Sequence, residues 1–567
     1  MKNIKFKYFQ IQLLAFLTFI FINISFAGLG QNSGNTNFEA AKNLEIFSTL
    51  FKELNINYVD EIKPAELIQD GIDNMLESLD PYTNYIPESE IEDYEFMTTG
   101  QYGGIGALIH KNGDYVVISE PYENFPAAKA GLIPGDKILE INGKSAKGKS
   151  VNDVSDILKG QPGTTCTLKI ERLGQKQSIE KTVIRQKITI DNIPYFGMLN
   201  DKIGYIRLSG FTQDASKEVK NAFLKLKESN HLNGIILDLR GNGGGLMNEA
   251  INIVNLFVEK GEVVVSTKGK LEDKNKTYRT MVPPLDKDIP LIILVNQGSA
   301  SASEIVAGAI QDLDRGVIVG QRTFGKGLVQ NVVPLCYNTR LKVTVAKYYI
   351  PSDRCIQAID YSHKNGNGNF EKIPDSLIRA FKTKKGRTVY DGGGINPDIK
   401  LEPTQYSNIS FSLTNKFLIF DFATKFYYEN PTIPSAKDFE INDSIFNNFV
   451  NYISDKDYDY TTKSEEELDK WKKIAEKENY FDEIKPEFEI LRTKMMHNKK
   501  DDLVKYKSEI ENLLKAEITT RYYFQKGRIQ STLATDNEIQ KAIEIIGNQQ
   551  MYNSILNGTL QKTDNPK

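Results

Sequence analysis

The sequence predicts a multidomain protein of mixed α+β and α/β class. At 567 residues the chain is longer than one hydrophobic core usually supports, and its pattern changes along its length. Apolar residues at helical spacing in 38–98 are followed in 100–186 by short strands separated by Gly and Pro. Residues 191–403 then alternate strand and helix, which is typical of an α/β layer, and residues 404–567 predict a charged, mainly helical C-terminal region.

The charge balance argues against nucleic acid as a partner. Lys and Arg together number 71 and Asp and Glu number 74, so the formal net charge is only −3. A chain without a global excess of positive charge has no general attraction to nucleic acid or to an anionic membrane. The composition is that of an ordinary globular protein.

The N-terminus has a different pattern. Lysines at positions 2, 5 and 7 precede an apolar run over residues 11–24, which ends at Ser25-Phe26-Ala27. Small residues at the first and third of these positions are typical of a signal-peptidase site. The run is shorter than the roughly 20 apolar residues that a bilayer span needs. We therefore expect residues 1–27 to be a secretory signal peptide and the protein to be periplasmic or in the cell envelope, with an uncleaved anchor as the alternative.

The three cysteines do not indicate a metal or redox site. Cys166, Cys336 and Cys355 show no C-x-x-C spacing, and we expect neither a metal nor a cofactor. An oxidising compartment would permit a disulfide between Cys336 and Cys355, which lie in one strand-rich stretch. The sequence leaves this pairing open.

The helices predicted in residues 38–98 carry apolar stripes. Leu44, Phe47 and Leu54 lie at helical spacing, and a second stripe follows in residues 68–79. Such stripes indicate packing or the surface of a homo-oligomer rather than a ligand site.

The strand-rich stretch contains three blocks in a distinctive order. The first is Tyr102-Gly103-Gly104-Ile105-Gly106, and residues 126–132 and 135–143 follow. This order resembles a PDZ domain, in which residues 102–106 would form the carboxylate-binding loop. Gly-rich loops present backbone N–H groups to a carboxylate, and an exposed strand edge pairs with an extended peptide. The resemblance implies binding of the C-termini of protein or peptide substrates, and the alternative is a Gly-rich hairpin without a ligand.

A candidate nucleophile lies between a predicted buried strand, 291–295, and an amphipathic helix, 303–313. The connecting segment, 296–304, reads Asn-Gln-Gly-Ser-Ala-Ser-Ala-Ser-Glu. A serine at such a helix start lies at the positive end of the helix dipole, where backbone N–H groups can bind an oxyanion. On this segment alone, a Ser-rich helix cap is an equal alternative.

The serine needs a base, and the histidines are poorly placed for that role. His110 lies in the PDZ-like stretch, His231 in a helix–strand turn, His363 in a Gly/Asn-rich loop and His497 in the charged tail. Lys326 is a better candidate, because burial depresses the pKa of a lysine and lets it act as a general base.

Two glycine-rich segments could be mistaken for nucleotide sites. Residues 320–327 nearly match a P-loop, but Gly327 replaces the Ser or Thr that would bind Mg²⁺, and a strand rather than a helix is predicted to follow. Residues 241–245 resemble a dinucleotide loop, but Leu246 occupies the position of its third glycine. We expect no nucleotide, and residues 241–245 are better suited to supply amides to an oxyanion.

Taken together, these segments resemble the carboxyl-terminal processing, or tail-specific, peptidases, which join a PDZ domain to a Ser/Lys catalytic core. The resemblance covers about residues 38–403 and implies a ClpP/crotonase-like α/β core with serine-type peptidase activity. Besides the PDZ blocks, it rests on residues 79–87, 238–245, 299–304, 325–330 and 393–398.

The family pattern assigns roles to individual residues. Its nucleophile is the middle serine of the run, Ser301, and its base is Lys326, which is 326 − 301 = 25 positions further on, as in the family. Gln330 would orient the lysine, and the amides of Ala302 and Gly244 would bind the oxyanion.

One further position matches the family pattern, and two stretches lie outside it. Asp312 matches an acidic position with a supporting role. An extra stretch, 359–390, separates the last core strands from Gly393, and the region after residue 403 is unmatched. These departures leave substrate access, oligomer geometry and any adaptor protein open.

The sequence therefore predicts a secreted serine endopeptidase that cleaves proteins with exposed or unstructured C-termini through an acyl-enzyme on Ser301. A catalytically silent PDZ scaffold or chaperone is the alternative from another class. A nonproteolytic hydrolase is disfavoured, because a peptide-binding module suits a chain-end substrate.

Overall fold

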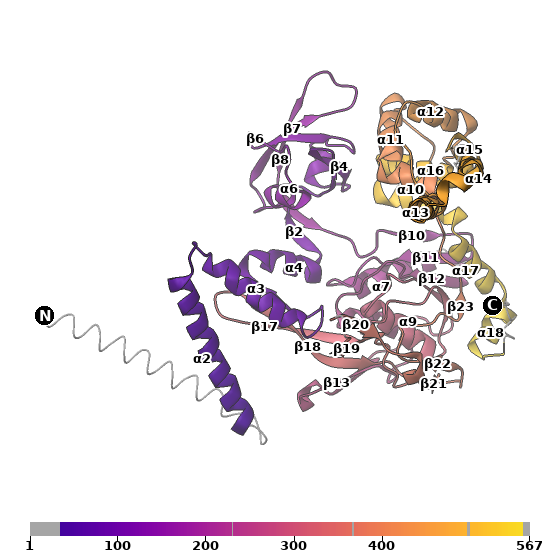
Figure 1. The fold of residues 1–567 in the computed structure, drawn as a ribbon. Coiled ribbons are helices and arrows are strands. Elements are labelled where there is room, and N and C mark those ends of the chain that lie inside the picture. Colours follow the sequence, from indigo (N-terminus) through magenta and orange to yellow (C-terminus); the bar gives the residue numbers. More distant parts are fainter. Residues whose placement is uncertain (1–33, 229–230, 366–367, 496–498, 560–567) are drawn as a thin grey trace. The chain divides into compact units, whose positions relative to one another are not determined.

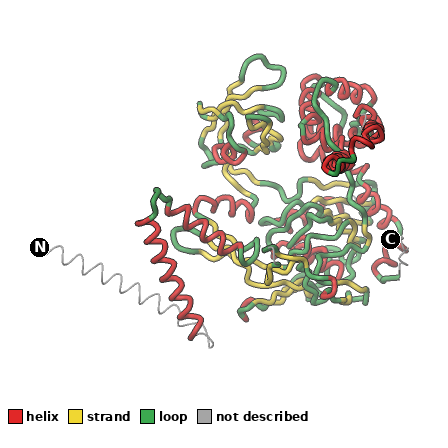
Figure 2. The backbone as a smooth tube through the Cα atoms, in the orientation of Figure 1, coloured by secondary structure: helices red, strands yellow, loops and turns green. Residues whose placement is uncertain are grey.

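The computed structural model describes residues 34–228, 231–365, 368–495 and 499–559. The predicted signal peptide, 1–27, and His497 lie outside them. The chain divides into two compact units, one ending at Tyr85 and the other beginning at Ile86. Figure 1 shows the order of the helices and strands along the chain, and Figure 2 distinguishes helices, strands and loops by colour.

The first unit is helical. It contains α2 (Gly34–Asn57) and α3 (Pro64–Glu77), where the apolar spacing predicts helices. Pro64 at the first turn of α3 suits a helix start, because its fixed φ is already helical and its missing N–H would have no partner there. After α3, the Asp80 carboxylate accepts the N–H groups of Tyr82 and Thr83, both at 2.8 Å, and so fixes the following turn.

The PDZ-like module is built on an antiparallel sheet with the order β3-β4-β5-β7-β8, in which β6 pairs with β5. Alternate apolar side chains such as Val116, Ile118 and Ile138 are fully buried in its core. The bounds are β3 (Ala107–Asn112), β4 (Tyr115–Pro121), α5 (Pro126–Lys129), β5 (Lys137–Ile141), β6 (Lys144–Ser145), α6 (Val151–Leu158), β7 (Thr165–Glu171) and β8 (Ile179–Ile184).

A two-stranded ribbon marks where the chain enters and leaves this module. β2 (Gln101–Gly104) follows α4 (Ile91–Thr99) and pairs antiparallel with β9 (Gln186–Thr189). Gly100 ends α4 with φ +69°, a left-handed conformation that suits glycine.

The α/β core is a six-stranded sheet covered by helices on both faces. Its order is β10-β11-β12-β15-β16-β23, with β10 antiparallel and the other pairs parallel. Its central strands are continuous apolar runs, as expected where both faces are buried. The strands are β10 (Tyr195–Met198), β11 (Ile203–Arg207), β12 (Gly234–Asp238), β15 (Leu291–Val295), β16 (Val317–Gly320) and β23 (Ile399–Lys400).

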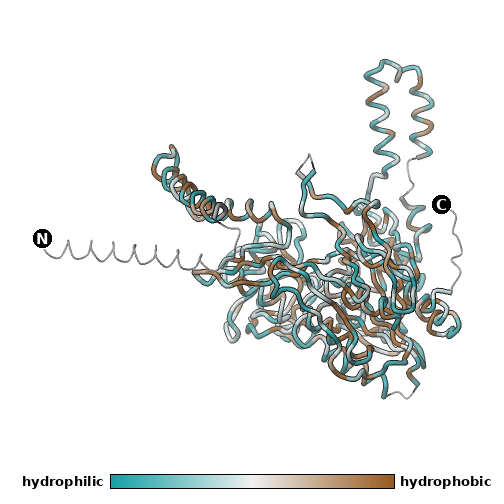
Figure 3. Tube along the Cα trace, turned by 90° about the horizontal axis from the view of Figure 1, so that it is seen from below, coloured by the Kyte–Doolittle hydropathy of each residue, from teal (hydrophilic) through white to brown (hydrophobic). Residues whose placement is uncertain are grey.

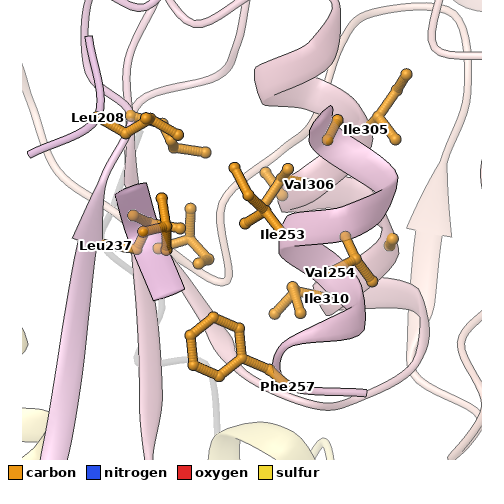
Figure 4. Packing of buried hydrophobic residues seen from close by; sticks show 14 of the residues in the cluster. Leu208, Leu237, Ile253, Val254, Phe257, Ile305, Val306 and Ile310 are labelled. Carbon is orange, nitrogen blue, oxygen red and sulfur yellow. The ribbon is translucent and has the colours of Figure 1, made fainter. Parts of the chain in front are cut away.

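One face of this sheet packs against α7 (Ala215–Lys227), α8 (Met247–Asn255) and α9 (Ala302–Asp312). Figure 4 shows this packing, with Leu208 and Leu237 on the side of the sheet and the helical side chains across from them. The labelled helical side chains are Ile253 and Val254 of α8, Phe257 just after α8, and Ile305, Val306 and Ile310 of α9.

The other face packs against the end of the chain. α17 (Asn537–Gly547) and α18 (Gln549–Leu556) share an apolar cluster with β11, β12, β15 and β16. A Cβ on Gly234 would lie 2.4 Å from the Ile546 side chain, so α17 lies directly on β12 and requires glycine there. The tail beyond residue 403 thus contributes two helices to the α/β core.

A second, antiparallel sheet is built around β18, which pairs with β13 and with β17, and β13 pairs in turn with β14. The bounds of these strands are β13 (Val263–Gly269), β14 (Lys276–Arg279), β17 (Leu328–Pro334) and β18 (Arg340–Tyr349). The extra stretch, 359–390, forms two hairpins, β19 (Ile359–Lys364) with β20 (Phe370–Lys372) and β21 (Ala380–Lys382) with β22 (Thr388–Tyr390).

The remaining tail is helical, as predicted. Its core gathers Phe422, Phe449 and Ile518 among other apolar side chains, and Figure 3 shows hydrophobic and hydrophilic residues alternating along its helices. The helices are α10 (Asn408–Asn415), α11 (Leu418–Glu429), α12 (Asp443–Ile453), α13 (Lys463–Lys477), α14 (Phe481–Met495), α15 (Lys499–Lys505) and α16 (Lys507–Thr532).

Within the described ranges, no helix is both long and apolar enough to span a membrane. All three cysteines are free thiols, with Cys166 buried and Cys336 exposed. In the same part of the chain, no cluster of His, Cys, Asp and Glu could hold a metal ion.

Candidate active site

The candidate nucleophile lies in a tight turn between β15 and α9. Ser301 has φ 55° and ψ −112°, a conformation that L-residues other than glycine rarely adopt. Ser299 and Ser303 are fully buried, and their hydroxyls donate to the carbonyl oxygens of Leu239 and Asn242, each at 2.8 Å. Of the three serines, Ser301 is therefore the one that lines the neighbouring cavity.

This cavity has a volume of about 540 Å³ and brings most of the predicted site together. Ser301, Lys326, Gln330 and the glycines 243–245 line it, together with residues of α4, α8, β17 and β18. A larger cavity of about 820 Å³ lies between α13 and α14. Its lining is mostly apolar and holds no serine–lysine pair with a glycine loop, so the smaller cavity is the candidate active site.

The glycine loop after β12 lies directly against the nucleophile. Gly244 has φ +101°, and a Cβ on it would lie 2.7 Å from the carbonyl oxygen of Ala300 and 2.9 Å from the amide nitrogen of Ala302. Only glycine fits there. However, the N–H of Gly244 donates to the Asn242 side chain at 2.9 Å. Its role as an oxyanion donor stays a prediction, because that N–H would have to leave Asn242.

Gln330 lies on β17 close to the predicted base. The pairing of β17 with β18 shifts register between Val329 and Gln330, and such irregularities re-aim side chains near active sites. The side-chain amide of Gln330 donates to the Thr344 hydroxyl at 3.1 Å. With its NH₂ group held by Thr344, the carbonyl oxygen of Gln330 can serve as an acceptor in the cavity.

The structure separates Asp312 from this group. Asp312 ends the 11-residue helix α9, so at 1.5 Å per residue it lies roughly 16 Å along the helix from Ser301. Its carboxylate pairs with Arg354 at 2.8 Å and accepts the N–H of Ser352 at 3.0 Å. These contacts fix the chain after β18, and Asp312 does not line the cavity.

Two residues at the site were missed by the sequence reasoning. The hydroxyl of Tyr348, on β18, donates to the carbonyl oxygen of Ser301 at 3.2 Å. The Glu304 carboxylate accepts the N–H groups of Ser301 and Lys326 at 2.8 and 2.9 Å. The spacing Ser301-x-x-Glu304 is a capping pattern and could have indicated the contact to Ser301, whereas Tyr348 gave no such signal.

A buried ionic network lies where β12 ends. The fully buried Asp238 carboxylate contacts Arg240 at 2.6 Å, Arg207 at 2.7 Å and the Tyr205 hydroxyl at 2.7 Å. Arg240 also binds Asp536 and Glu538, at the start of α17. Although burial alone raises the pKa of Asp238, the two guanidiniums and these hydrogen bonds hold it well below its usual value.

In the PDZ-like module, the predicted carboxylate loop is part strand and part turn. Tyr102, Gly103 and Gly104 lie in β2, Ile105 is buried, and Gly106 turns into β3 with φ +73°. A Cβ on Gly106 would lie 2.7 Å from the Phe125 side chain, so glycine is required. β3 is the end strand of the described sheet, and α6 lies beside it.

Comparison with known proteins supports this organisation. Residues 202–362 match the model of peptidase family S41, residues 117–172 that of a PDZ domain, and residues 409–546 that of a probable PDZ-protease C-terminal helical domain. The chain is 35% identical over 352 residues to a carboxy-terminal-processing protease of Bartonella bacilliformis, covering 61% of this chain and 80% of that protein. It is 31% identical over 407 residues to a probable CtpA-like serine protease of Staphylococcus aureus, covering 71% and 78%.

Solved structures include relatives of the same kind. The photosystem II D1 C-terminal processing protease is 28% identical, with a TM-score of 0.35 and coverage of 63% of this chain and 92% of that one. The PDZ domain of a Vibrio cholerae carboxy-terminal protease, solved with a peptide, is 28% identical, with a TM-score of 0.15 and coverage of 16% and 99%. The mixed fold class and the family resemblance are confirmed, and the chain belongs to peptidase family S41, as a PDZ-containing serine-type protease of the carboxyl-terminal processing kind.

Proposed function

We propose that Ser301 and Lys326 form the catalytic dyad of this protease. The observation that carries the proposal is the shared cavity, which Ser301, Lys326, Gln330 and the glycine loop all line. In the part of the chain that the structure describes, no histidine lines it. A serine hydrolase without a histidine needs another base at the nucleophile, and lysine can supply it.

The chemistry follows from the positions of these groups. Lys326, in its neutral form, takes the proton from the Ser301 hydroxyl as the oxygen attacks the substrate carbonyl. The N-terminus of α9 stabilises the negative charge that develops on the carbonyl oxygen, with the Ala302 N–H and a glycine-loop N–H as donors. The peptide leaves with the proton from Lys326, and water then hydrolyses the acyl-enzyme.

Gln330 keeps the lysine aligned. Its amide NH₂ is held by Thr344, which leaves its carbonyl oxygen to accept a hydrogen bond from the Lys326 amine. Gln330 therefore acts as a positioning residue on the base.

The PDZ domain recognises the C-terminus of the substrate. β3 is an end strand with α6 beside it, so an extended peptide can add to the sheet and lie between the two. The N–H groups around Ile105 and Gly106 bind the terminal carboxylate. Substrates are accordingly proteins or peptides whose C-termini are exposed or unstructured, and the domain either delivers the chain or uncovers the catalytic cavity.

Export to the periplasm or cell envelope belongs to the same proposal and rests on the pattern of residues 1–27. Mass spectrometry of the mature protein is expected to find Gly28 at its N-terminus. A mature chain that still begins at Met1 would contradict cleavage. An adaptor protein and a homo-oligomer remain part of the proposal, to be tested by pull-down and by sedimentation of the mature protein.

The dyad is tested with Ser301→Ala and Lys326→Ala on a reporter that has an unstructured C-terminus. Each variant is expected to lose turnover while its thermal unfolding stays close to that of the parent. Lys347→Ala is a matched control, because Lys347 lies on β18 with an exposed side chain and does not line the cavity. Turnover retained in either dyad variant would refute the mechanism. Peptide binding without any cleavage by the parent would instead favour the silent scaffold.

A further inference from the structure

We propose that Glu304 is a positioning residue that ties the nucleophile and the base to one buried carboxylate, and that its ionised form is the one that aligns them. The inference rests on the Ser301/Lys326 dyad proposed above. It goes beyond the dyad, since it concerns which group holds the two residues in their relative positions and how pH controls that alignment.

The geometry joins two segments that are distant in sequence. One oxygen of Glu304, Oε2, accepts the backbone N–H of Ser301 at 2.8 Å and that of Lys326 at 2.9 Å. The other, Oε1, accepts the backbone N–H of Gly325 at 2.7 Å and the Thr323 hydroxyl at 2.6 Å. A single side chain thus fixes the main chain of both dyad members.

Further contacts complete this arrangement. The N–H of Gly327 donates to the side chain of Gln357 at 2.7 Å, so three consecutive N–H groups around Lys326 are bound by buried side chains. On the nucleophile side, Tyr348 binds the carbonyl oxygen of Ser301. The unfavourable φ of Ser301 persists only because surrounding contacts hold it, and Glu304 supplies one of them.

The protonation state of Glu304 decides whether all four contacts can form. An ionised carboxylate only accepts hydrogen bonds, and here four donors converge on its two oxygens. A protonated carboxyl carries a hydrogen on one of its oxygens. On Oε2 this hydrogen would oppose the N–H groups of Ser301 and Lys326, and on Oε1 it would oppose the N–H of Gly325 and require the Thr323 hydroxyl to reverse. Protonation therefore loosens either the Ser301 and Lys326 contacts or those to Gly325 and Thr323.

The surroundings place this protonation near neutral pH. Burial raises the pKa of Glu304 to about 7, against the opposing effect of the hydrogen bonds from Thr323, Lys326, Ser301 and Gly325. Other titratable or charged groups on the elements packed against it are Tyr348 on β18 and, on the adjacent loop, Lys326 and Arg322. Burial, and then the Glu304 charge, raise the pKa of Tyr348 well above its usual value, so Tyr348 stays neutral. Arg322 is directed to Asn396.

The test is the pH dependence of kcat for the parent and for Glu304→Gln on the unstructured reporter. In the parent, activity needs a neutral Lys326 and an ionised Glu304, so the logarithm of kcat should fall with a limiting slope of two on the acid side. In Glu304→Gln the slope should be one, the plateau about 10²-fold lower because the dyad is misaligned, and KM little changed. Glu304→Asp, which keeps the charge, should retain the slope of two.

Asp398→Asn is the matched control. Asp398 is also a carboxylate of the core, with 7% of its side chain exposed, but it binds Gln311, Ile318 and Arg387 and does not line the catalytic cavity. It should destabilise the fold and leave the acid slope at two.

A slope of two in Glu304→Gln, or a reduced plateau without any change of slope, would overturn the positioning role. That result is distinct from failure of the proposed dyad, which would show as turnover in Ser301→Ala or Lys326→Ala. If Glu304→Gln does not fold, Glu304→Asp provides the test. An acid slope of one in Glu304→Asp, which keeps the carboxylate, would also overturn the inference.

Discussion

Asp238 and Glu304 are both fully buried carboxylates of the catalytic core, yet their surroundings differ. Asp238 is neutralised by two guanidiniums, and its pKa is held low. Glu304 accepts hydrogen bonds from four neutral donors, three backbone N–H groups and the Thr323 hydroxyl, and burial raises its pKa. A carboxylate with cationic partners is a permanent structural ion, whereas one with neutral donors changes charge near neutral pH. The first region joins α17 to the sheet, and the second holds the proposed catalytic residues, Ser301 and Lys326.

The largest effect should come from breaking the ionic region. Arg240→Met leaves Asp238 with one guanidinium, that of Arg207, and removes the contacts to Asp536 and Glu538. Breaking a buried pair in this way costs about 3–5 kcal/mol of the free energy of unfolding, because a buried charge loses its compensation. Urea denaturation at neutral pH measures the loss.

Arg279→Ala serves as the control for this experiment, because Arg279 is exposed and makes its contact to a backbone carbonyl. It should change stability by less than about 0.5 kcal/mol. An Arg240→Met protein as stable as this control would show that the ionic region does not hold α17 on the core.

A smaller effect on the free energy of unfolding is expected when the pH is changed and Glu304 ionises. Because its folded pKa lies above the unfolded value, its contribution to stability is complete below about pH 4.5 and is lost as pH rises through about 7. The free energy of unfolding of the parent minus that of Glu304→Gln should therefore fall by up to about 3 kcal/mol between pH 4 and pH 8. Denaturation series at several pH values measure it.

Asp238 has the opposite sign, since its folded pKa is lowered. Its contribution to the free energy of unfolding is present above its unfolded pKa and is lost only in strong acid. This contribution therefore hardly changes between pH 4 and pH 8. A difference between parent and Glu304→Gln that rises with pH would contradict the contrast between the two carboxylates.

The smallest effect should come from Tyr348→Phe. This change removes one hydrogen bond to the Ser301 carbonyl and keeps the ring, so it should cost about 1 kcal/mol of stability. We expect the acid slope of kcat to stay at two, because Glu304 is untouched. A slope of one in Tyr348→Phe would assign the second ionisation to a group other than Glu304.

The two regions also differ in how far the sequence predicts them. The apolar runs predict β12, β15 and α9, and the family resemblance predicts which serine and lysine lie together. Asp238 and Arg240 stand in a recognised motif, but their link to α17 joins residues almost 300 positions apart, and no local pattern indicates which surface an amphipathic helix will cover. The prediction for Gly244 missed that Asn242 binds its N–H, because that contact depends on the exact path of the loop.

Ser301 acting with Lys326 is the central claim, and a covalent label tests it most directly. The parent, Lys326→Ala and Lys347→Ala proteins would be treated with a peptidyl fluorophosphonate that carries a free C-terminus, and the modified residue located by mass spectrometry. We predict one adduct, on Ser301, that forms at the parental rate in Lys347→Ala and far more slowly in Lys326→Ala. An adduct on another residue, or equal rates with and without Lys326, would contradict the account.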